Sequence, residues 1–219
     1  MRDVGCWWDI LELLALLCKQ TSRLLKWFPM AKIFDHLLNR DLAHVIRFNN
    51  RPQHFPESVA EHSFYVAYFV LIICSLLEKK KIKVDIKKAL AMALVHDAEE
   101  GFSGDILNPF KHFNEKVYAA IREVNRQMVG EMFADLPKEL SSELVEQWKE
   151  ENAAKSIESQ VVKVADKLQL LSKCFEEIAA GNTYFEEIYK DQLSSLKKLN
   201  QPWWKKIASE VLSGAEKEI

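Results

Sequence analysis

Two histidines and two aspartates are the residues of this 219-residue chain whose types and order could hold a metal ion. His96 and Asp97 are adjacent and follow an apolar run, so both side chains can leave the end of one helix together. His62 comes earlier in the chain and Asp166 comes later. Imidazole nitrogens and carboxylate oxygens both bind divalent cations. The four residues are therefore candidate metal ligands, whereas the His-Asp pair alone is better explained as the polar end of a helix.

The element that must carry His62 begins at a capping box. Ser58 and Glu61 have the S-x-x-E spacing in which the two residues satisfy each other's backbone N–H groups at a helix start. His62 then stands four residues before Val66, on the side of the helix that carries the apolar stripe. We expect His62 to point into the protein, either as a metal ligand or as a hydrogen-bonded core histidine.

Asp166 interrupts an apolar stretch of a second predicted helix, which runs from Ser156 to about Ala180 and is stopped by Gly181. A carboxylate among apolar neighbours is costly unless it is paired, hydrogen-bonded or bound to a metal. Pairing with Lys163 or Lys167 is the alternative to a functional role. The position therefore marks Asp166 as a candidate ligand.

Composition favours one globular, almost entirely helical domain. The chain is 48% hydrophobic, has only six glycines and six prolines, and spaces its apolar residues mostly three or four apart. Lys plus Arg (30) nearly balances Asp plus Glu (32), so no overall attraction to nucleic acid is expected. The four cysteines, Cys6, Cys18, Cys74 and Cys174, form no Cys-x-x-Cys pair, which is typical of reduced thiols in a cytoplasmic protein.

The remaining helices follow from the same periodicity. We expect helices over residues 31–47, 58–78, 85–99, 114–134, 137–151 and 156–180, then one or two packing helices toward the C-terminus. The first of these ends at Arg47, a candidate helix-end cation beside a proline-stopped loop. A loop bounded by glycine and proline is expected over 101–109, where Asp105 and Asn108 either line a pocket or serve as turn residues.

Residues 1–28 are expected to form an amphipathic helical extension, separate from the domain at 29–219. The apolar run from Trp7 to Cys18 is interrupted by Asp9 and Glu12 and is too short to cross a bilayer. Packing on the domain or on a second subunit is the preferred interpretation. Attachment to a lipid surface through the tryptophans and nearby basic residues is the alternative.

With these residues in place, the chain resembles the HD superfamily of metal-dependent phosphohydrolases, through its H...HD...D pattern. Within it, the sequence is most similar to the HD-domain 5'-deoxynucleotidase family, over about residues 31–200. The matching words are Ser58-Val59-Ala60-Glu61-His62-Ser63, His96-Asp97-Ala98-Glu99-Glu100, Ser103-Gly104-Asp105, Lys111-His112-Phe113-Asn114, Val164-Ala165-Asp166 and Glu176-Glu177-Ile178-Ala179-Ala180-Gly181-Asn182. The resemblance implies an all-α helical bundle with the metal held between helices.

The resemblance also implies roles for single residues. It makes His62, His96, Asp97 and Asp166 the ligands of one divalent ion, Co²⁺, Mn²⁺ or a similar metal, with His62, Asp97 and Asp166 also facing the substrate. Arg47 matches the arginine that orients the substrate phosphate, and Glu100 matches the carboxylate that assists proton transfer. Asp105, Ile106, Leu107 and Asn108 match the loop that contacts the nucleoside. Phe48 stands where the family usually has tryptophan, so an aromatic wall remains without an indole N–H donor.

The resemblance further implies an activity and a set of partners. We expect a phosphomonoesterase that hydrolyses nucleoside 5'-monophosphates, preferably deoxyribonucleotides, and that forms a homodimer without a membrane or nucleic-acid partner. One alternative is another HD phosphohydrolase acting on a nucleotide polyphosphate or phosphodiester. The other is a helical adaptor without catalysis. Glu99 receives no role, and His36, His44, His54 and His112 are expected to be surface or structural residues.

Overall fold

The computed structural model describes residues 33–215 of the chain. Between these limits the secondary structure is helical, with one isolated antiparallel bridge between Ile46 and Ser58. The α-helices are α2 (Ile33–Leu37), α3 (Val59–Lys79), α4 (Ile86–Val95), α5 (Glu100–Ser103), α6 (Asn108–Lys111), α7 (Glu115–Met132), α8 (Lys138–Ala153), α9 (Ile157–Ala179), α10 (Glu186–Lys197), α11 (Pro202–Lys205) and α12 (Ala208–Val211). Two 3₁₀ turns, η1 (Asp41–Ala43) and η2 (Thr183–Phe185), complete the elements. The predicted all-α class is confirmed.

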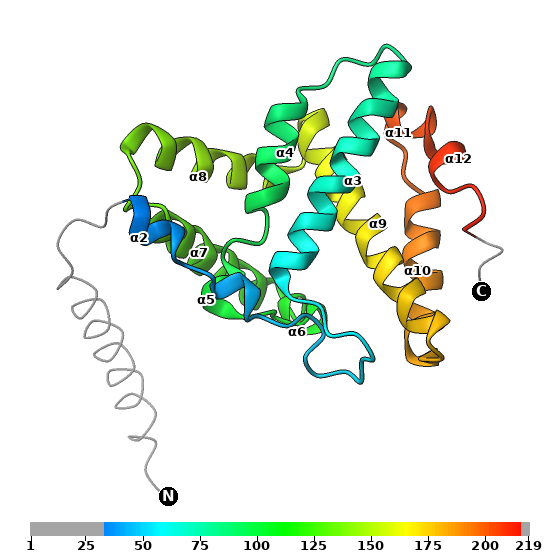
Figure 1. Ribbon diagram of the computed structural model, residues 1–219, viewed down its shortest axis with the longest axis horizontal. Coiled ribbons are helices and arrows are strands. Elements are labelled where there is room, and N and C mark those ends of the chain that lie inside the picture. The colour runs from blue at the N-terminus through cyan, green and yellow to red at the C-terminus, as the bar shows by residue number, and fades with distance from the viewer. Residues whose placement is uncertain (1–32, 216–219) are drawn as a thin grey trace, which may run out of the picture.

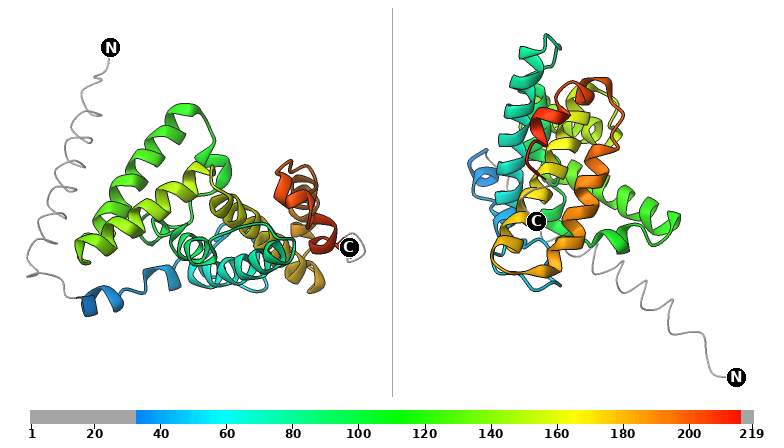
Figure 2. Two further views of the ribbon diagram at one scale, coloured as in Figure 1. Left: turned by 90° about the horizontal axis from the view of Figure 1, so that it is seen from above. Right: turned by 90° about the vertical axis from the view of Figure 1, so that its right-hand side faces the viewer.

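Three helices form the centre of the molecule. α3 packs on α4 and α9, and α10 covers another side of α9. α7 and α8 lie to one side of this group and α10 to α12 lie to the other, as Figures 1 and 2 both show. The main apolar core combines residues of α3, α4, α9 and α10 with Trp203, Trp204 and Ile207. A smaller cluster joins the end of α4 to Val129, Phe133 and Trp148.

The long helices begin where the sequence predicts. Ser58 Oγ accepts from the Glu61 N–H, and the Glu61 carboxylate accepts from the Ser58 N–H at 2.8 Å, which completes the capping box of α3. Asp85 and Asn114 accept hydrogen bonds at the starts of α4 and α7. α9 starts after the Ser156 cap and ends just before Gly181, whose φ of 90° suits glycine.

The predicted continuous helix over residues 31–47 is wrong. α2 ends at Leu37, and Asn39 Oδ1 then accepts the Asp41 N–H at 2.9 Å, a local bond that competes with helix continuation. Further on, the Arg47 N–H donates to Glu57 O and the Val59 N–H donates to Val45 O, both at 2.9 Å. These two backbone hydrogen bonds hold Arg47 beside the start of α3. They are tertiary contacts, so the spacing of apolar residues could not predict them.

Two more expectations need correction or lie outside the described residues. The loop expected over 101–109 is confined to 104–107, because α5 includes residues 101–103 and α6 starts at residue 108. The extension at residues 1–28 lies outside the part of the chain that the structure describes. By length and composition alone α3 could cross a membrane, but eight of its residues, His62 among them, are buried inside the bundle.

Candidate active site

The four predicted ligands meet where the first turn of α3, the end of α4 and the middle of α9 converge. The Nε2 atoms of His62 and His96 lie 3.1 Å apart. Asp97 Oδ2 is 3.1 Å from His96 Nε2 and 3.4 Å from His62 Nε2, and Asp166 Oδ1 is 3.4 Å from His62 Nε2. His62, His96 and Asp166 form a group whose ligand atoms could hold one metal ion. The helices therefore gather residues that are far apart in the sequence.

The second nitrogen of each histidine faces an oxygen, which leaves Nε2 as the ligand atom. His96 Nδ1 lies 2.8 Å from the Ala93 carbonyl oxygen, and His62 Nδ1 lies 2.7 Å from Gln169 Oε1. At His96 a protonated Nδ1 donates to the Ala93 oxygen and keeps the Nε2 lone pair free, as metal-binding histidines require. His62 Nδ1 also lies 2.8 Å from Arg47 Nη1, which can only donate, so Nδ1 of His62 donates to Gln169 only in the state in which Nε2 binds a metal. This arrangement fits a divalent cation between the two rings.

Electrostatics at the cluster also favour a cation. Burial lowers the pKa of His96, but the Asp97 carboxylate more than offsets it and raises that pKa to about 10. Burial raises the pKa of Asp97, yet His96 and His62 bring it well below its ordinary value. The cluster thus stabilises positive charge on the His96 ring, at the position where a bound metal would supply that charge. The donor atoms and the local electrostatic field of the carboxylates both fit a metal ion.

Asp166 lies at this cluster and not in a surface ion pair. The two lysines that could have neutralised it have other partners: Lys163 Nζ is 2.7 Å from Glu151 Oε1, and Lys167 Nζ donates to Ser195 Oγ at 3.4 Å. The alternative of a structural lysine pair is therefore wrong for Asp166.

Arg47 stands directly behind His62. Its Nη1 lies 2.8 Å from His62 Nδ1 and donates to Glu57 Oε2 and to Gln169 Oε1, both at 2.9 Å. Burial lowers the pKa of Arg47, but Asp166 and Glu57 raise it above its ordinary value, so the guanidinium stays charged. A buried, fixed cation next to the metal cluster can bind an anionic ligand.

Phe48 and the loop before α6 are tied together. The Phe48 N–H donates to Asp105 Oδ2 at 2.8 Å, and the Phe48 backbone has a φ of 53°, a left-handed conformation that is costly for a phenylalanine. The ring packs edge-on against Phe185 at 5.8 Å. Asp105 thus joins the 104–107 loop to the arginine segment, while Ile106 and Leu107 are half-buried beside it and Asn108 begins α6.

Glu100 is the buried carboxylate nearest in sequence to the ligand pair. Backbone bonds at 96–101 continue the turn, including the Glu100 N–H to Asp97 O at 3.0 Å. Glu100 Oε1 accepts from Lys111 Nζ at 3.2 Å, and Oε2 is buried without a hydrogen-bond partner among the described residues. Burial and the charge of Asp97 raise the pKa of Glu100 to about 8. Its carboxyl can therefore hold a proton near neutral pH.

Sequence reasoning missed three of the contacting residues: Glu57, Lys111 and Gln169. Gln169 lies three residues after Asp166 on α9, a spacing that places both on one helix face and could have identified it. Lys111 belongs to one of the sequence segments on which the resemblance rests, but the resemblance assigned no role to Lys111. Glu57 comes just before the capping box, where the sequence gives no sign that it faces Arg47.

The residues without an assigned role lie outside the cluster. Glu99 accepts from Trp148 Nε1 at 2.7 Å and from Asn125 Nδ2 at 3.2 Å, so it joins α7 and α8 to the end of α4. His112 stacks on Tyr118 with ring centres 5.0 Å apart, and His36 contacts Phe133 at 5.9 Å. His54 lies beside Phe55 and His44 ends η1. These positions agree with structural or surface roles.

Comparisons with known proteins agree with this geometry. A family model described as 5'-deoxynucleotidase YfbR-like matches residues 34–213. A 5'-deoxynucleotidase from Citrobacter koseri is 33% identical over 133 residues, which are 59% of this chain and 65% of that protein. The match therefore spans slightly less than two thirds of this relative's length.

Similarity to solved structures identifies the fold. An HD-domain phosphohydrolase from Listeria innocua superposes with a TM-score of 0.69 at 27% identity, covering 84% of this chain and 91% of that chain. The HD phosphohydrolase of cyanophage S-2L, solved with dA and one catalytic Zn²⁺ ion, has a TM-score of 0.57 at 14% identity, covering 87% and 99%. That second likeness shows the fold alone. Because the family model covers most of the chain, this protein belongs to the YfbR-like 5'-deoxynucleotidase family of HD-domain hydrolases.

Proposed function

We propose that this protein is a metal-dependent phosphomonoesterase that releases phosphate from nucleoside 5'-monophosphates, preferably deoxyribonucleotides. One observation carries the proposal: two histidine nitrogens and two carboxylates converge beside a buried arginine and a carboxyl with a raised pKa. A metal site, an anion-binding cation and a proton donor are the groups that phosphate ester hydrolysis needs. A purely structural metal site would have no use for the last two.

His62, His96, Asp97 and Asp166 would hold one divalent ion. When bound, this ion supplies a Lewis acid and lowers the pKa of bound water. We propose Co²⁺, Mn²⁺ or a similar transition metal; the cyanophage neighbour was solved with zinc. The Ala93 carbonyl keeps the His96 imidazole in the tautomer that presents Nε2, and Gln169 Oε1 accepts from His62 Nδ1 when His62 Nε2 binds the ion.

Arg47 binds the phosphate in this scheme. Its hydrogen bonds to protein use Nη1, so among the described contacts Nη2 remains for a phosphate oxygen. Glu57 and Gln169 hold the guanidinium in place before the substrate arrives, which reduces the entropy lost on binding. Negative charge on the phosphoryl group is thereby balanced from the side of α3.

Glu100 protonates the departing 5'-oxygen. Its raised pKa keeps a proton on the carboxyl at neutral pH, and a general acid of this kind contributes on the order of 100-fold or more to the rate. Lys111, bonded to Oε1, orients the carboxyl and leaves Oε2 to face the leaving group.

Phe48 and the 105–108 segment contact the nucleoside. Phe48 supplies an apolar wall, and the Phe48 N–H to Asp105 bond links that wall to the loop. The relatives named 5'-deoxynucleotidase support a preference for deoxyribose. We include a cytoplasmic location in the proposal, because Cys74 and Cys174 are free buried thiols.

A substrate panel tests the proposal. Purified protein stripped of metal and reloaded with Co²⁺ or Mn²⁺ is assayed for phosphate release from deoxyribonucleoside and ribonucleoside 5'-monophosphates, nucleoside triphosphates and cyclic dinucleotides. We expect release from the monophosphates, fastest from the deoxy series, and at least 100-fold less with Glu100→Gln at equal metal content. Hydrolysis confined to polyphosphates or phosphodiesters would assign another reaction, and no hydrolysis of any compound would refute catalysis.

A further inference from the structure

Lys163 stands in a stretch of α9 that is otherwise buried. The residues beside it in the sequence all belong to the apolar core: Val161, Val162, Val164 and Ala165. A lysine in such a stretch needs a partner, because burying an unpaired charge is costly. Its partner is Glu151 on α8, whose Oε1 lies 2.7 Å from Lys163 Nζ. The pair therefore joins α8 to α9 at the place where these two helices pack together.

Stability alone does not explain this ion pair. Removing a carboxylate and an ammonium from water is costly, so apolar side chains of similar volume often stabilise a fold equally well or better. The Glu151 side chain is only 1% exposed, and its Oε2 is buried without a hydrogen-bond partner among the described residues. The Lys163 side chain, by contrast, is 42% exposed. A buried carboxylate thus holds in place a cation that a ligand can still reach.

This accessible ammonium lies close to the candidate metal cluster. Lys163 is one helical turn before Asp166, so both side chains lie on the same side of α9. Burial lowers the pKa of Lys163, but Glu151, Asp166 and Asp97 raise it above its ordinary value, so the ammonium stays charged. Within the described part of the chain, no ion pair joins Lys163 to Asp97 or Asp166. Both carboxylates therefore remain available to a metal, and the ammonium remains available to an anion.

Lys163 and Arg47 flank Asp166 along α9. Arg47 donates to Gln169, three residues after Asp166, whereas Lys163 stands three residues before it. The two α9 positions are therefore about 9 Å apart along the helix axis, with Asp166 between them. The carboxylates of Asp97 and Asp166 act on both cations. An anion bound at the cluster would thus have a positive charge on either side.

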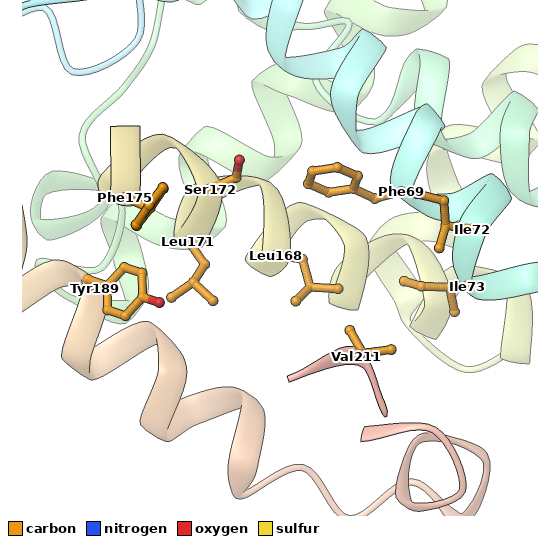
Figure 3. Close-up of a pocket in the computed structure, with 9 residues that line it drawn as sticks. All are labelled: Phe69, Ile72, Ile73, Leu168, Leu171, Ser172, Phe175, Tyr189 and Val211. Atoms are coloured by element: carbon orange, nitrogen blue, oxygen red, sulfur yellow. The ribbon is translucent and has the colours of Figure 1, made fainter. Parts of the chain in front are cut away.

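The opposite face of α9 is apolar and offers no comparable attraction. Leu168 and Phe175 are each about half a turn around the helix from Asp166. They line the pocket of about 470 Å³ that Figure 3 shows, together with side chains of α3, α10 and α12. Among the described residues that line this pocket, none is charged. The charges of α9 that could bind an anion are therefore gathered on the side that carries Lys163 and Asp166.

We propose that Lys163 is a second phosphate-binding residue of this site and that Glu151 positions it. The inference rests on the proposed function and adds a cation that faces the phosphate from the side of α8. A phosphate monoester has three terminal oxygens, of which the Lewis acid and Arg47 take up two in the proposed scheme. The Lys163 ammonium donates to the remaining oxygen. It has three N–H donors, and the described contacts use one of them, at Glu151.

Binding of inorganic phosphate to the full chain loaded with Mn²⁺ or Co²⁺, measured by calorimetry, tests the proposal without requiring turnover. The informative variant combines Lys163→Met with Glu151→Met, because it leaves no unpaired buried carboxylate. We expect its phosphate dissociation constant to rise about 10-fold or more at equal metal content, since a hydrogen bond to a charged group is lost. Lys163→Arg, which keeps a cation, should recover part of the affinity.

A neighbouring ion pair supplies the matched control. Lys88 Nζ lies 2.6 Å from Glu150 Oε1, so this pair joins α4 to α8 one residue away from Glu151. The carboxylates that act on Lys88 do not include a candidate metal ligand. Lys88→Met with Glu150→Met removes the same two charges and should leave phosphate binding unchanged. Lys163→Gln with Glu151→Gln, whose amides can still hydrogen-bond to each other, repeats the test if the methionine variant loses its helical circular dichroism.

The single variant Lys163→Met separates phosphate binding from a structural role. If Lys163 only neutralised Glu151, adding Glu151→Met to it would restore phosphate affinity, whereas we expect the single and double variants to bind phosphate equally weakly. Restored affinity in the double variant, wild-type affinity in both variants, or a metal-loaded wild type that binds no phosphate would overturn the proposal. Phosphate binding that depends on Lys163 in a protein that hydrolyses no nucleotide would support this inference and refute the proposed function.

Discussion

Individual contacts decide what the candidate site can do. The two imidazoles have their Nδ1 atoms against oxygens of Gln169 and Ala93, while Asp97 contacts both Nε2 atoms. Glu100 stands one turn further on with a pKa of about 8. Proton positions at these few atoms would therefore govern the proposed metal binding and proton transfer, and three predictions belong to this scale.

Glu100→Gln should change the pH dependence of stability in the metal-free protein. The folded pKa of Glu100, about 8, is above its ordinary value of 4.5, so the wild type loses stability from this group as the pH rises from 4.5 to 8. Glutamine cannot ionise and does not incur that loss. Thermal unfolding in EDTA should show Tm of the variant rising relative to wild type between pH 5 and pH 8.5. A constant Tm difference across this range would mean that the carboxyl has no raised pKa.

Gln169→Leu should weaken metal binding. The glutamine is buried and accepts from the His62 Nδ1–H when Nε2 binds a metal, and losing such a partner costs about 10- to 100-fold in metal affinity. Competition with a chromophoric chelator measures the affinity. Gln169→Glu, which keeps the acceptor, should recover part of it, and Gln192→Leu on α10 should leave it unchanged. Equal affinities for wild type and Gln169→Leu would remove Gln169 from the site.

Metal binding should release a proton. Burial lowers the pKa of His96, but the Asp97 carboxylate raises it to about 10. The His96 ring is therefore protonated at pH 7 in the metal-free protein and must lose its proton to bind a metal. Calorimetric titration in two buffers of different ionisation enthalpy should give about one proton per chain, and metal affinity should fall as the pH is lowered. Heats that do not depend on the buffer would contradict this.

At the scale of elements, the segment from Arg47 to Glu57 is held by a buried ion pair on α9. Glu177 accepts from the His54 and Phe55 N–H groups at 2.9 and 3.0 Å, and Lys173 Nζ lies 2.7 Å from it while also donating to the Phe55 carbonyl. Burial raises the pKa of Glu177, but the His54 N–H and Lys173 lower it to about 2. The pair thus fixes the loop that carries the proposed phosphate-binding arginine.

Lys173→Met should destabilise the protein by about 3 kcal/mol or more, because it leaves a buried carboxylate without its partner. The loosened loop should also raise KM for a nucleotide more than it lowers kcat, since Arg47 is then less well placed. Urea unfolding and steady-state kinetics measure the two effects. Lys149→Met breaks an exposed pair with Glu146 and should change stability by less than about 1 kcal/mol. Equal effects of both substitutions would contradict the role of the Lys173–Glu177 pair.

Some of these elements could be predicted from the sequence and others could not. Capping residues such as Ser58, Asp85 and Ser156 act locally, so the starts of α3, α4 and α9 could be predicted from single positions. The path of residues 45–47 could not be predicted, because it depends on backbone pairing with residues 57–59, which the spacing of apolar residues does not indicate. Gln169 and Lys111 were missed for a related reason: each acquires its role only when α9 or α6 folds against another element.

At the scale of the whole molecule, the bundle brings together residues from three separate helices. The fold and the family are shown by the matched model and the HD-domain neighbours. The α3–α4–α9 core explains why the site can be rigid: His62, His96 and Asp166 are each attached to a helix whose other face is buried in one apolar cluster. Catalysis by a single metal ion held at this junction is the central claim.

Titration of metal-free protein with Co²⁺, following 5'-dAMP hydrolysis after each addition, tests that claim most directly. The account predicts no phosphate release without metal, a linear rise to one equivalent per chain and a plateau beyond it. The variants His96→Ala and Asp166→Ala should lack the rise while retaining their helical circular dichroism. Full activity in the metal-free protein, or a rise that continues to several equivalents, would contradict it.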